Sequence, residues 1–221
     1  MVKLEEFLKR IVVGDTAQFW IEGKTLNTLA VSGDQTETTR GIYKGSEVEK
    51  LPTNFQTDPS KIKEIISILS NDVSFELDNS QMKISSNKMQ VAFRLSVFDN
   101  PAKLNESKYI DTFTLSGDDI KSLLAYQKVV GGKDLYFENK GDKAQAVVIG
   151  LIEGDIAVLT LNYKLKYGKV AFTGKVYDIL RKNQEGLTVK ITEDGTMGKF
   201  SFSDENSTVD YYLGTIEETE E

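Results

Sequence analysis

Four short stretches repeat apolar residues at the spacing i, i+3, i+4, i+7, which places a single apolar stripe along an α-helix. The spacing is complete in the first two stretches, whereas Gln127 and Asn183 occupy the last position in the third and fourth. The stripes begin at Leu4, Ile62, Ile120 and Val176, so they start 58, 58 and 56 residues apart. Such near-constant intervals predict four similar units. We expect their helices within residues 3–11, 60–69, 118–128 and 174–183.

Each predicted helix is followed by runs in which apolar and polar residues alternate, as in strands with one buried face. The clearest example is the segment 70–95, where Val73, Phe75 and Leu77 alternate with polar neighbours before the turn residues Asp78-Asn79-Ser80. We predict three antiparallel strands in every unit. Their ranges are 18–21, 25–31 and 38–43, then 73–77, 82–84 and 89–95, then 135–138, 144–152 and 156–165, and finally 187–192, 197–203 and 208–216.

The segment 96–111 is polar, contains Pro101 and divides the four units two and two. After it, Ser116 and Asp119 have the spacing of a capping box that opens the third helix. We therefore predict an α+β fold with two similar domains, 1–98 and 112–221, joined by an extended connector at 99–111. Each domain would hold two helix-plus-three-strand units.

The composition is that of a soluble globular chain, because 39% of its 221 residues are hydrophobic and 28% are charged. No apolar run approaches the roughly 20 residues that a membrane span requires. The N-terminus has acidic residues within its apolar pattern and does not resemble a signal peptide. We therefore expect a cytoplasmic protein without membrane contact.

The chain contains no cysteine and no histidine, which excludes disulfides, Ser-His-Asp triads and His-containing zinc sites. Carboxylate or lysine chemistry would remain for an enzyme. However, Asp78, Asp155 and Asp194 stand in turns, where aspartate is frequent for conformational reasons. Asp118-Asp119 is explained by helix capping, and no Gly-rich phosphate loop occurs. We expect no enzymatic activity, no metal and no cofactor.

Charge is distributed unevenly along the chain. The helix windows hold ten basic and six acidic residues, so they carry +4 while the remainder carries −11 of the net −7. A basic helix face on an acidic protein fits sequence-independent contact with phosphates, although exposed helix faces also carry lysine for solvation alone. The ten basic residues are Lys3, Lys9, Arg10, Lys61, Lys63, Lys121, Lys128, Lys175, Arg181 and Lys182.

Three stretches of the sequence resemble one family. DPSKIKEIISILSNDVSFELDNSQMKISS is similar to the second half of a clamp domain, FTLSGDDIKSLLAYQKVVGGKDLYFE to the opening of a second one, and DYYLGTIEETEE to a clamp C-terminus. The chain thus resembles the two-domain DNA sliding clamps, typified by proliferating cell nuclear antigen and phage DNA polymerase processivity factors. Its length favours a phage or viral origin, which would make the location the host cell cytoplasm.

This resemblance implies a homotrimeric ring in which helices line the hole, sheets form the outside and edge strands pair between subunits. The ten basic residues would face duplex DNA. A DNA polymerase, and a clamp loader where one is used, would dock hydrophobic peptides under the connector, in a pocket formed by Leu104, Tyr211, Tyr212 and Leu213. The alternative is a β-rich viral structural or assembly protein with an internal duplication, which would need no basic helix face.

Overall fold

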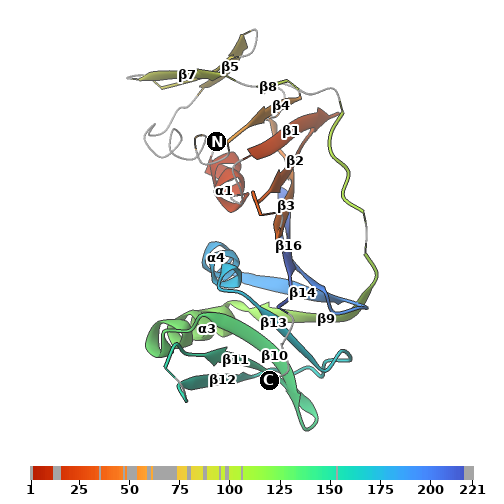
Figure 1. Ribbon diagram of the computed structural model, residues 1–221. Coiled ribbons are helices and arrows are strands. Elements are labelled where there is room, and N and C mark those ends of the chain that lie inside the picture. The colour runs from red at the N-terminus through yellow and green to blue at the C-terminus, as the bar shows by residue number, and fades with distance from the viewer. Residues whose placement is uncertain are drawn as a thin grey trace. The chain divides into compact units, whose positions relative to one another are not determined.

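The computed structural model describes residues 2–11, 16–34, 36–46, 48, 54–58, 61, 74–78, 81–86, 89–94, 96–97, 100–105, 107–152 and 154–216. The chain forms two compact units. The N-terminal unit comprises Met1–Asn105 with Ser203–Asp210, and the C-terminal unit comprises Glu106–Phe202 with Tyr211–Glu221. Each unit combines antiparallel sheets with few helices, in agreement with the predicted α+β class (Figure 1).

The N-terminal unit contains one described helix, α1 (Val2–Arg10), which packs on a sheet with the strand order β8-β4-β1-β2-β3. Leu4, Phe7 and Leu8 form the buried stripe of the helix, as their spacing predicts. The Phe7 ring lies against Gly41, where a β-carbon would overlap it, so only glycine permits this close approach. The strands are β1 (Thr16–Glu22), β2 (Thr25–Val31), β3 (Glu37–Lys44), β4 (Phe55–Thr57) and β8 (Ser96–Val97).

A second sheet of this unit is the antiparallel meander expected from the segment 70–95. It consists of β5 (Ser74–Asp78), β6 (Gln81–Ser85) and β7 (Gln90–Arg94), in that order. Met82 and Ile84 of its central strand are buried, which confirms the predicted apolar face. Of the helix predicted at 60–69, only Lys61 lies within the described residues, and it is helical.

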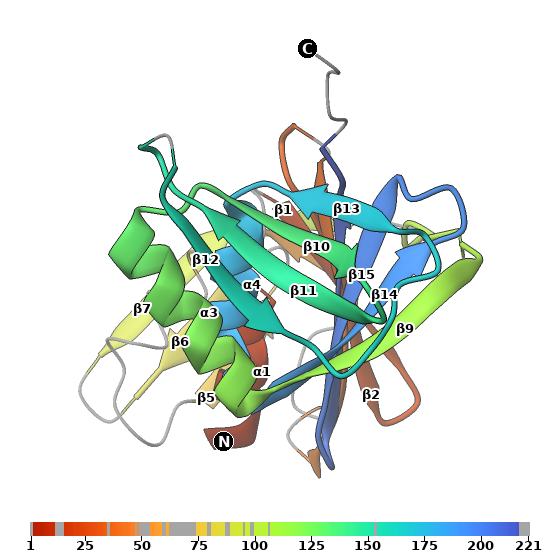
Figure 2. The ribbon, with the colours of Figure 1, turned by 90° about the horizontal axis from the view of Figure 1, so that it is seen from below.

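The C-terminal unit contains two helices, α3 (Gly117–Val130) and α4 (Lys175–Lys182), one four-stranded sheet and strands of a second, larger sheet. One sheet has the order β12-β11-β10-β13, and α3 packs along its β11 and β12 strands (Figure 2). The strands of the larger sheet in this unit follow the order β16-β15-β14-β9. The strands are β9 (Tyr109–Ser116), β10 (Asp134–Lys140), β11 (Lys143–Ile149), β12 (Ile156–Thr160), β13 (Lys169–Phe172), β14 (Gly186–Thr192), β15 (Met197–Ser203) and β16 (Ser207–Gly214).

Aromatic rings connect the two sheets of the C-terminal unit. The ring of Phe172 on β13 meets Phe200 on β15 edge to face, with ring centroids 5.2 Å apart, and Phe137 on β10 meets Phe113 on β9 at the same distance. Phe137, Phe172 and Phe200 are fully buried. Offset and edge-to-face contacts of this kind stabilise a core beyond the burial of apolar area alone.

The capping box predicted for the third helix is confirmed. The Ser116 hydroxyl accepts a hydrogen bond from the Asp119 amide at 3.1 Å, while the Asp119 carboxylate accepts one from the Ser116 amide at 2.8 Å. Two of the helix's free N–H groups are therefore satisfied by local side chains. Among the described helices, none has the length and apolar character needed to cross a bilayer.

The structure adds a strand before three of the helical positions, and these strands were missing from the sequence prediction. They are β4, β9 and β13. β13 has only four residues, the last three of them buried, so it shows no alternation. β9 begins at Tyr109, inside the segment assigned to the connector. Its residue Asp111 is buried, although an aspartate in a sequence indicates an exposed position. Conversely, the run predicted at 156–165 ends as a strand at Thr160.

Candidate functional site

The helices α3 and α4 bury their apolar stripes and carry their basic residues outside these stripes. Ile120 and Leu123 of α3 are buried, as are Ile179 and Leu180 of α4. Lys128 occupies the last turn of α3, and Arg181 and Lys182 occupy the last turn of α4. Cations at these positions interact favourably with the negative ends of the helix dipoles.

A groove of about 480 Å³ lies between the two helices, and we call it the helix groove. Arg181 is held there by two hydrogen bonds, one to the Asp178 carboxylate at 2.7 Å and one to Oε1 of Gln127 on α3 at 2.8 Å. These contacts hold the guanidinium at the junction of the helices, in the same groove as Lys128. The lining residues are Leu124, Gln127, Lys128, Gly131, Gly132 and Arg181.

The positive charge of this helix pair is concentrated at the C-terminal ends. Near the start of α3, Lys121 is offset by Asp118, whose carboxylate lies 3.5 Å from its ammonium group. Exposed pairs of this kind contribute little to stability. Lys128 is exposed, and Lys175 and Lys182 are half-buried.

The basic residues of the N-terminal unit are less uniform. Lys9 is exposed at the end of α1, and Lys61 is also exposed. Arg10 is only 12% exposed, and its guanidinium lies 3.5 Å from the Asp204 carboxylate. Lys63 lies outside the described residues, as does the side chain of Lys3. The ten residues are therefore divided five and five between two units, and their joint contact with DNA stays a prediction.

Asp204, which pairs with Arg10, lies at the edge of a depression in the N-terminal unit. A depression of about 220 Å³ is lined by Glu6, Tyr43 and residues 204–207, which include Asp204 and Glu205. Burial alone would raise the pKa of Asp204, but the amides of Asn206 and Ser207 and the charge of Arg10 hold it below its ordinary value. Hydrogen bonds from residues 206–207 therefore do more than Arg10 to keep Asp204 ionised.

The residues predicted for the partner pocket near the C-terminus are buried. Tyr211 is fully buried, and its hydroxyl accepts a hydrogen bond from Asn183 at 3.1 Å. Tyr212 and Leu213 are also buried. Leu104 is half-buried and belongs to the N-terminal unit. A pocket that combines these four residues stays a prediction.

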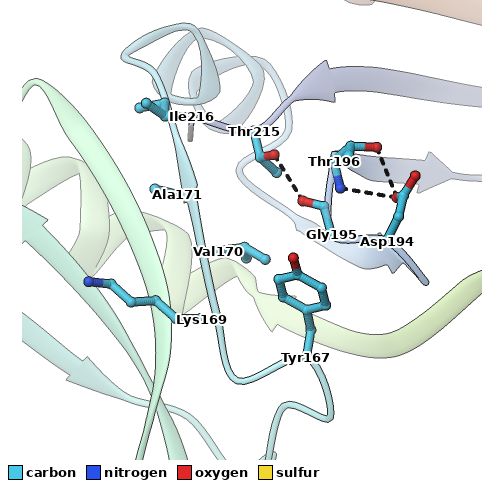
Figure 3. A pocket seen from close by; sticks show the side chains of 9 residues that line it. All are labelled: Tyr167, Lys169, Val170, Ala171, Asp194, Gly195, Thr196, Thr215 and Ile216. Atoms are coloured by element: carbon cyan, nitrogen blue, oxygen red, sulfur yellow. Dashed lines mark hydrogen bonds between the residues drawn. The ribbon is translucent and has the colours of Figure 1, made fainter. Parts of the chain in front are cut away.

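The two residues after Gly214 line an open depression of about 380 Å³, which we call the tail depression (Figure 3). The ring of Tyr167 forms one wall and points toward Gly195, where a β-carbon would overlap it. Gly195 also has a φ of +71°, which favours glycine. The Thr215 hydroxyl donates to the Gly195 carbonyl at 2.9 Å. The lining residues are Tyr167, Lys169, Val170, Ala171, Asp194, Gly195, Thr196, Thr215 and Ile216.

A buried carboxylate positions Tyr167 in this wall. Asp111 on β9 is fully buried and accepts hydrogen bonds from the Tyr163 hydroxyl at 2.8 Å and from the amides of Lys166 and Tyr167 at 2.7 and 2.9 Å. Burial, followed by the hydrogen bond to Asp111, raises the pKa of Tyr163 above its ordinary value. The loop that carries Tyr167 is thereby attached to the sheet.

A second depression of about 550 Å³ shares Asp194 and Thr196 with the tail depression, and we call it the connector depression. The shared turn is rigid, because the Asp194 carboxylate accepts the Thr192 hydroxyl at 2.7 Å and the Thr196 amide at 3.1 Å. These bonds lower the pKa of Asp194. The lining residues are Ser107, Lys108, Thr192, Glu193, Asp194, Thr196 and Met197.

Sequence reasoning missed Tyr167, Asp111 and the turn at Asp194 as parts of a site. Tyr167 follows a predicted strand without any local signal, and its wall exists only because Gly195 is close in space. The signal that could have located the site is the run Thr192-Glu193-Asp194-Gly195-Thr196, since Asp-Gly between two strands predicts a tight turn. Within the described part of the chain, no three or more acidic side chains are arranged to hold a metal ion.

The fold is that of the sliding clamps. The structure is similar to A. fulgidus PCNA bound to the C-terminal region of FEN-1, with a TM-score of 0.77 at 14% identity, covering 99% of this chain and 96% of that one. It is also similar to the proliferating cellular nuclear antigen of Entamoeba histolytica, with a TM-score of 0.72 at 12% identity and 96% coverage of each chain. No protein-family description and no curated protein sequence matches the chain.

Proposed function

We propose that this chain is a subunit of a sliding clamp that encircles duplex DNA and tethers a DNA polymerase for processive replication. The observation that carries the proposal is the basic exposed side of α3 and α4, which meets at the helix groove in a chain of net charge −7. Lys128 in this groove offers positive charge, and Arg181 beside it is paired with Asp178. Such a charge binds phosphates regardless of sequence, as a sliding protein requires.

The exposed edge of the C-terminal unit supports closure into a ring. Every residue of β12 is exposed or half-buried, although its sequence, Ile156-Ala157-Val158-Leu159-Thr160, is largely apolar. Ile156 and Val158 are 56% and 43% exposed. An exposed apolar edge strand can pair with another chain, and a second copy of this protein is the partner that a ring supplies.

Apolar side chains continue beyond this edge. Leu151 and Ile152, in the hairpin turn before β12, are 74% and 70% exposed, and Val129 near the end of α3 is 83% exposed. A β-carbon on Gly131 would lie 4.0 Å from Leu151, so the hairpin turn adjoins the end of α3. An apolar surface of this kind on an isolated subunit indicates a protein interface.

The tail depression is a place where a partner peptide can attach to the C-terminal unit. It combines the Tyr167 ring and Ile216 with the polar groups of Asp194 and Thr196. Concave surfaces with apolar walls and a few polar groups are where ligands bind. A short peptide with a few buried anchors would bind with an affinity on the order of micromolar.

A threading experiment tests the proposal without a loader or a polymerase. Linear duplex DNA with biotin at both ends is incubated with the protein, and streptavidin is added either before or after the protein. A ring enters over open ends and is trapped only when streptavidin is added afterwards. We expect more protein to co-elute with the DNA in high salt in that order of addition. Equal amounts of co-eluting protein in both orders of addition would show that the protein binds DNA from the side, and this result would contradict the proposal.

A further inference from the structure

The basic residues of α3 and α4 are four lysines and one arginine, Arg181. An arginine presents a rigid planar fork that can hold a phosphate through two parallel hydrogen bonds, whereas a lysine is a point charge on a flexible chain. Among these side chains, Arg181 is therefore the one suited to holding a phosphate at a fixed position. The lysines are Lys121, Lys128, Lys175 and Lys182.

The guanidinium of Arg181 is held within the helix pair. Its Nη1 donates to the Asp178 carboxylate at 2.7 Å, and its Nη2 donates to Oε1 of Gln127 at 2.8 Å. Both terminal nitrogens of the fork therefore already have a partner. A phosphate that approaches Arg181 also meets the negative charge of Asp178, whose side chain is 63% exposed.

Gln127 departs from the apolar stripe of α3, and its contacts explain why. It occupies the last stripe position, where the first two predicted helices have an apolar residue. Its amide nitrogen donates to the Gly132 carbonyl at 3.4 Å, which turns the amide oxygen toward Arg181 on the other helix. The polar residue at this position thus helps to hold the arginine in place.

The N-terminal unit shows the same pairing of an arginine with an aspartate. Arg10 lies in the last turn of α1, and its guanidinium is 3.5 Å from the Asp204 carboxylate. Arg181 likewise lies in the last turn of α4 and pairs with Asp178. In both described helices that carry an arginine, an aspartate therefore reduces the charge that the arginine offers to a phosphate.

We propose that Asp178 limits the affinity of the helix pair for DNA, because with Gln127 it holds Arg181 and keeps it from gripping a phosphate. The inference rests on the proposed function and explains why the contact with DNA stays loose. A ring that slides must leave each phosphate as readily as it meets it. A phosphate held by the full arginine fork would slow movement along the duplex.

The test titrates the full chain into a fluorescein-labelled linear duplex and follows fluorescence anisotropy at several salt concentrations. Asp178→Asn keeps the shape of the side chain and removes its charge, so Arg181 is released. We expect about threefold tighter binding, the size of one exposed ion pair. The slope of log affinity against log salt should become steeper by roughly 0.9, the value for one added phosphate contact. Unchanged or weaker binding would overturn the proposal.

Asp142→Asn is the matched control, because it removes the same charge elsewhere in the C-terminal unit. Asp142 is exposed in the turn between β10 and β11, and its carboxylate lies 3.5 Å from the Lys164 ammonium. This variant should keep the natural affinity and the natural salt slope. An equal gain in both variants would reduce the effect to net charge and would also overturn the proposal.

A double-mutant cycle tests whether Asp178 acts through Arg181. In the background of Arg181→Gln, the further change Asp178→Asn should alter DNA affinity no more than Asp142→Asn does. A gain of the same size without Arg181 would mean that the carboxylate acts by repelling phosphates directly, and the role given to Arg181 would be wrong. Urea midpoints of all variants at neutral pH show whether they are equally folded.

These outcomes are separate from those of the ring itself, because anisotropy detects binding to linear duplex whether or not the protein encircles it. A gain that depends on Arg181 would support the role of Asp178 even if threading failed. Threading without such a gain would leave the ring intact and remove only this inference. Tracking of single molecules on stretched duplex should show slower diffusion of Asp178→Asn than of the natural chain, and equal diffusion would contradict the proposal.

Discussion

Asp111 shows how a single buried carboxylate determines the shape of the surface around it. Its oxygens accept three hydrogen bonds from the loop that carries Tyr163, Lys166 and Tyr167. Asp111→Ala would leave these donors without their acceptor, so we expect a loss of about 3 kcal/mol in the free energy of unfolding. Urea denaturation measures this loss directly.

The control for this variant is Asp142→Ala, because Asp142 is exposed and makes a long ion pair with Lys164, 3.5 Å between the charged atoms. We expect a change within about 0.5 kcal/mol there. Similar losses in the two variants would show that Asp111 does not anchor the loop.

Two tyrosines with raised pKa values predict how the stability of the protein depends on alkaline pH. Burial raises the pKa of Tyr177 above its ordinary value, with the charge of Asp134 adding to the effect, and the pKa of Tyr163 is also raised. A raised folded-state pKa contributes stability that is full below about pH 10 and is lost as pH rises through the folded-state value. The protein should therefore lose stability above pH 10.

The variant Tyr177→Phe separates the loss of stability caused by ionisation of Tyr177 from the loss caused by lysines, which also titrate near pH 10. The variant loses the hydrogen bond from the Tyr177 hydroxyl to the Asp134 carbonyl, 3.0 Å, which costs about 1 kcal/mol at neutral pH. Urea midpoints at pH 8 and pH 11 should show a smaller decline for the variant than for the natural chain. Parallel declines would contradict the role given to Tyr177.

At the scale of elements, the sequence predicted what is local and missed what depends on distant partners. The helices α1, α3 and α4 were predictable because each carries its own apolar stripe, and Ser116 with Asp119 marks the start of α3. β13 was not, because its four residues are a strand only through pairing with β10. The tail depression was missed for the same reason, since Tyr167 and Gly195 meet only in the folded chain.

The basic ends of the helices predict a change in the salt dependence of DNA binding. Replacing Lys121, Lys128 and Lys182 with alanine removes charge from α3 and α4 while leaving their buried stripes intact. The slope of log affinity against log salt should fall by roughly 0.9 per lost phosphate contact. Titrations of duplex DNA at several salt concentrations measure it.

Lys140→Ala with Lys143→Ala is the control for this change, because both residues are exposed on a hairpin away from the helices. That variant should retain the natural slope. If the helix variant also retains the natural slope, the basic residues of the helices serve only to solvate exposed helix surfaces and do not contact DNA.

The apolar edge strand predicts a variant that stays folded but does not assemble. Val158→Lys places a charge on β12 at a side chain that is 43% exposed in the isolated chain. Charged residues on an edge strand oppose pairing with another chain, so the variant should sediment as a monomer with a normal unfolding curve. Thr114→Lys, at an exposed position of β9, should leave assembly unchanged.

At the scale of the whole molecule, the two halves of the C-terminal unit exchange their leading strands. β9 precedes α3 but pairs with β14, and β13 precedes α4 but pairs with β10. The four-unit repeat was visible in the sequence, whereas this exchange was not, because helix spacing carries no information on strand partners. The two helices of the unit are in contact, and Lys128 and Arg181 line the same groove between them.

The mass of the protein in solution tests the central claim most directly, because encircling DNA requires several subunits. Sedimentation equilibrium across a concentration series compares the chain mass of 24.7 kDa with the trimer mass, about 74 kDa. We predict convergence on the trimer mass at micromolar concentration. A mass of one chain at every concentration would contradict the ring.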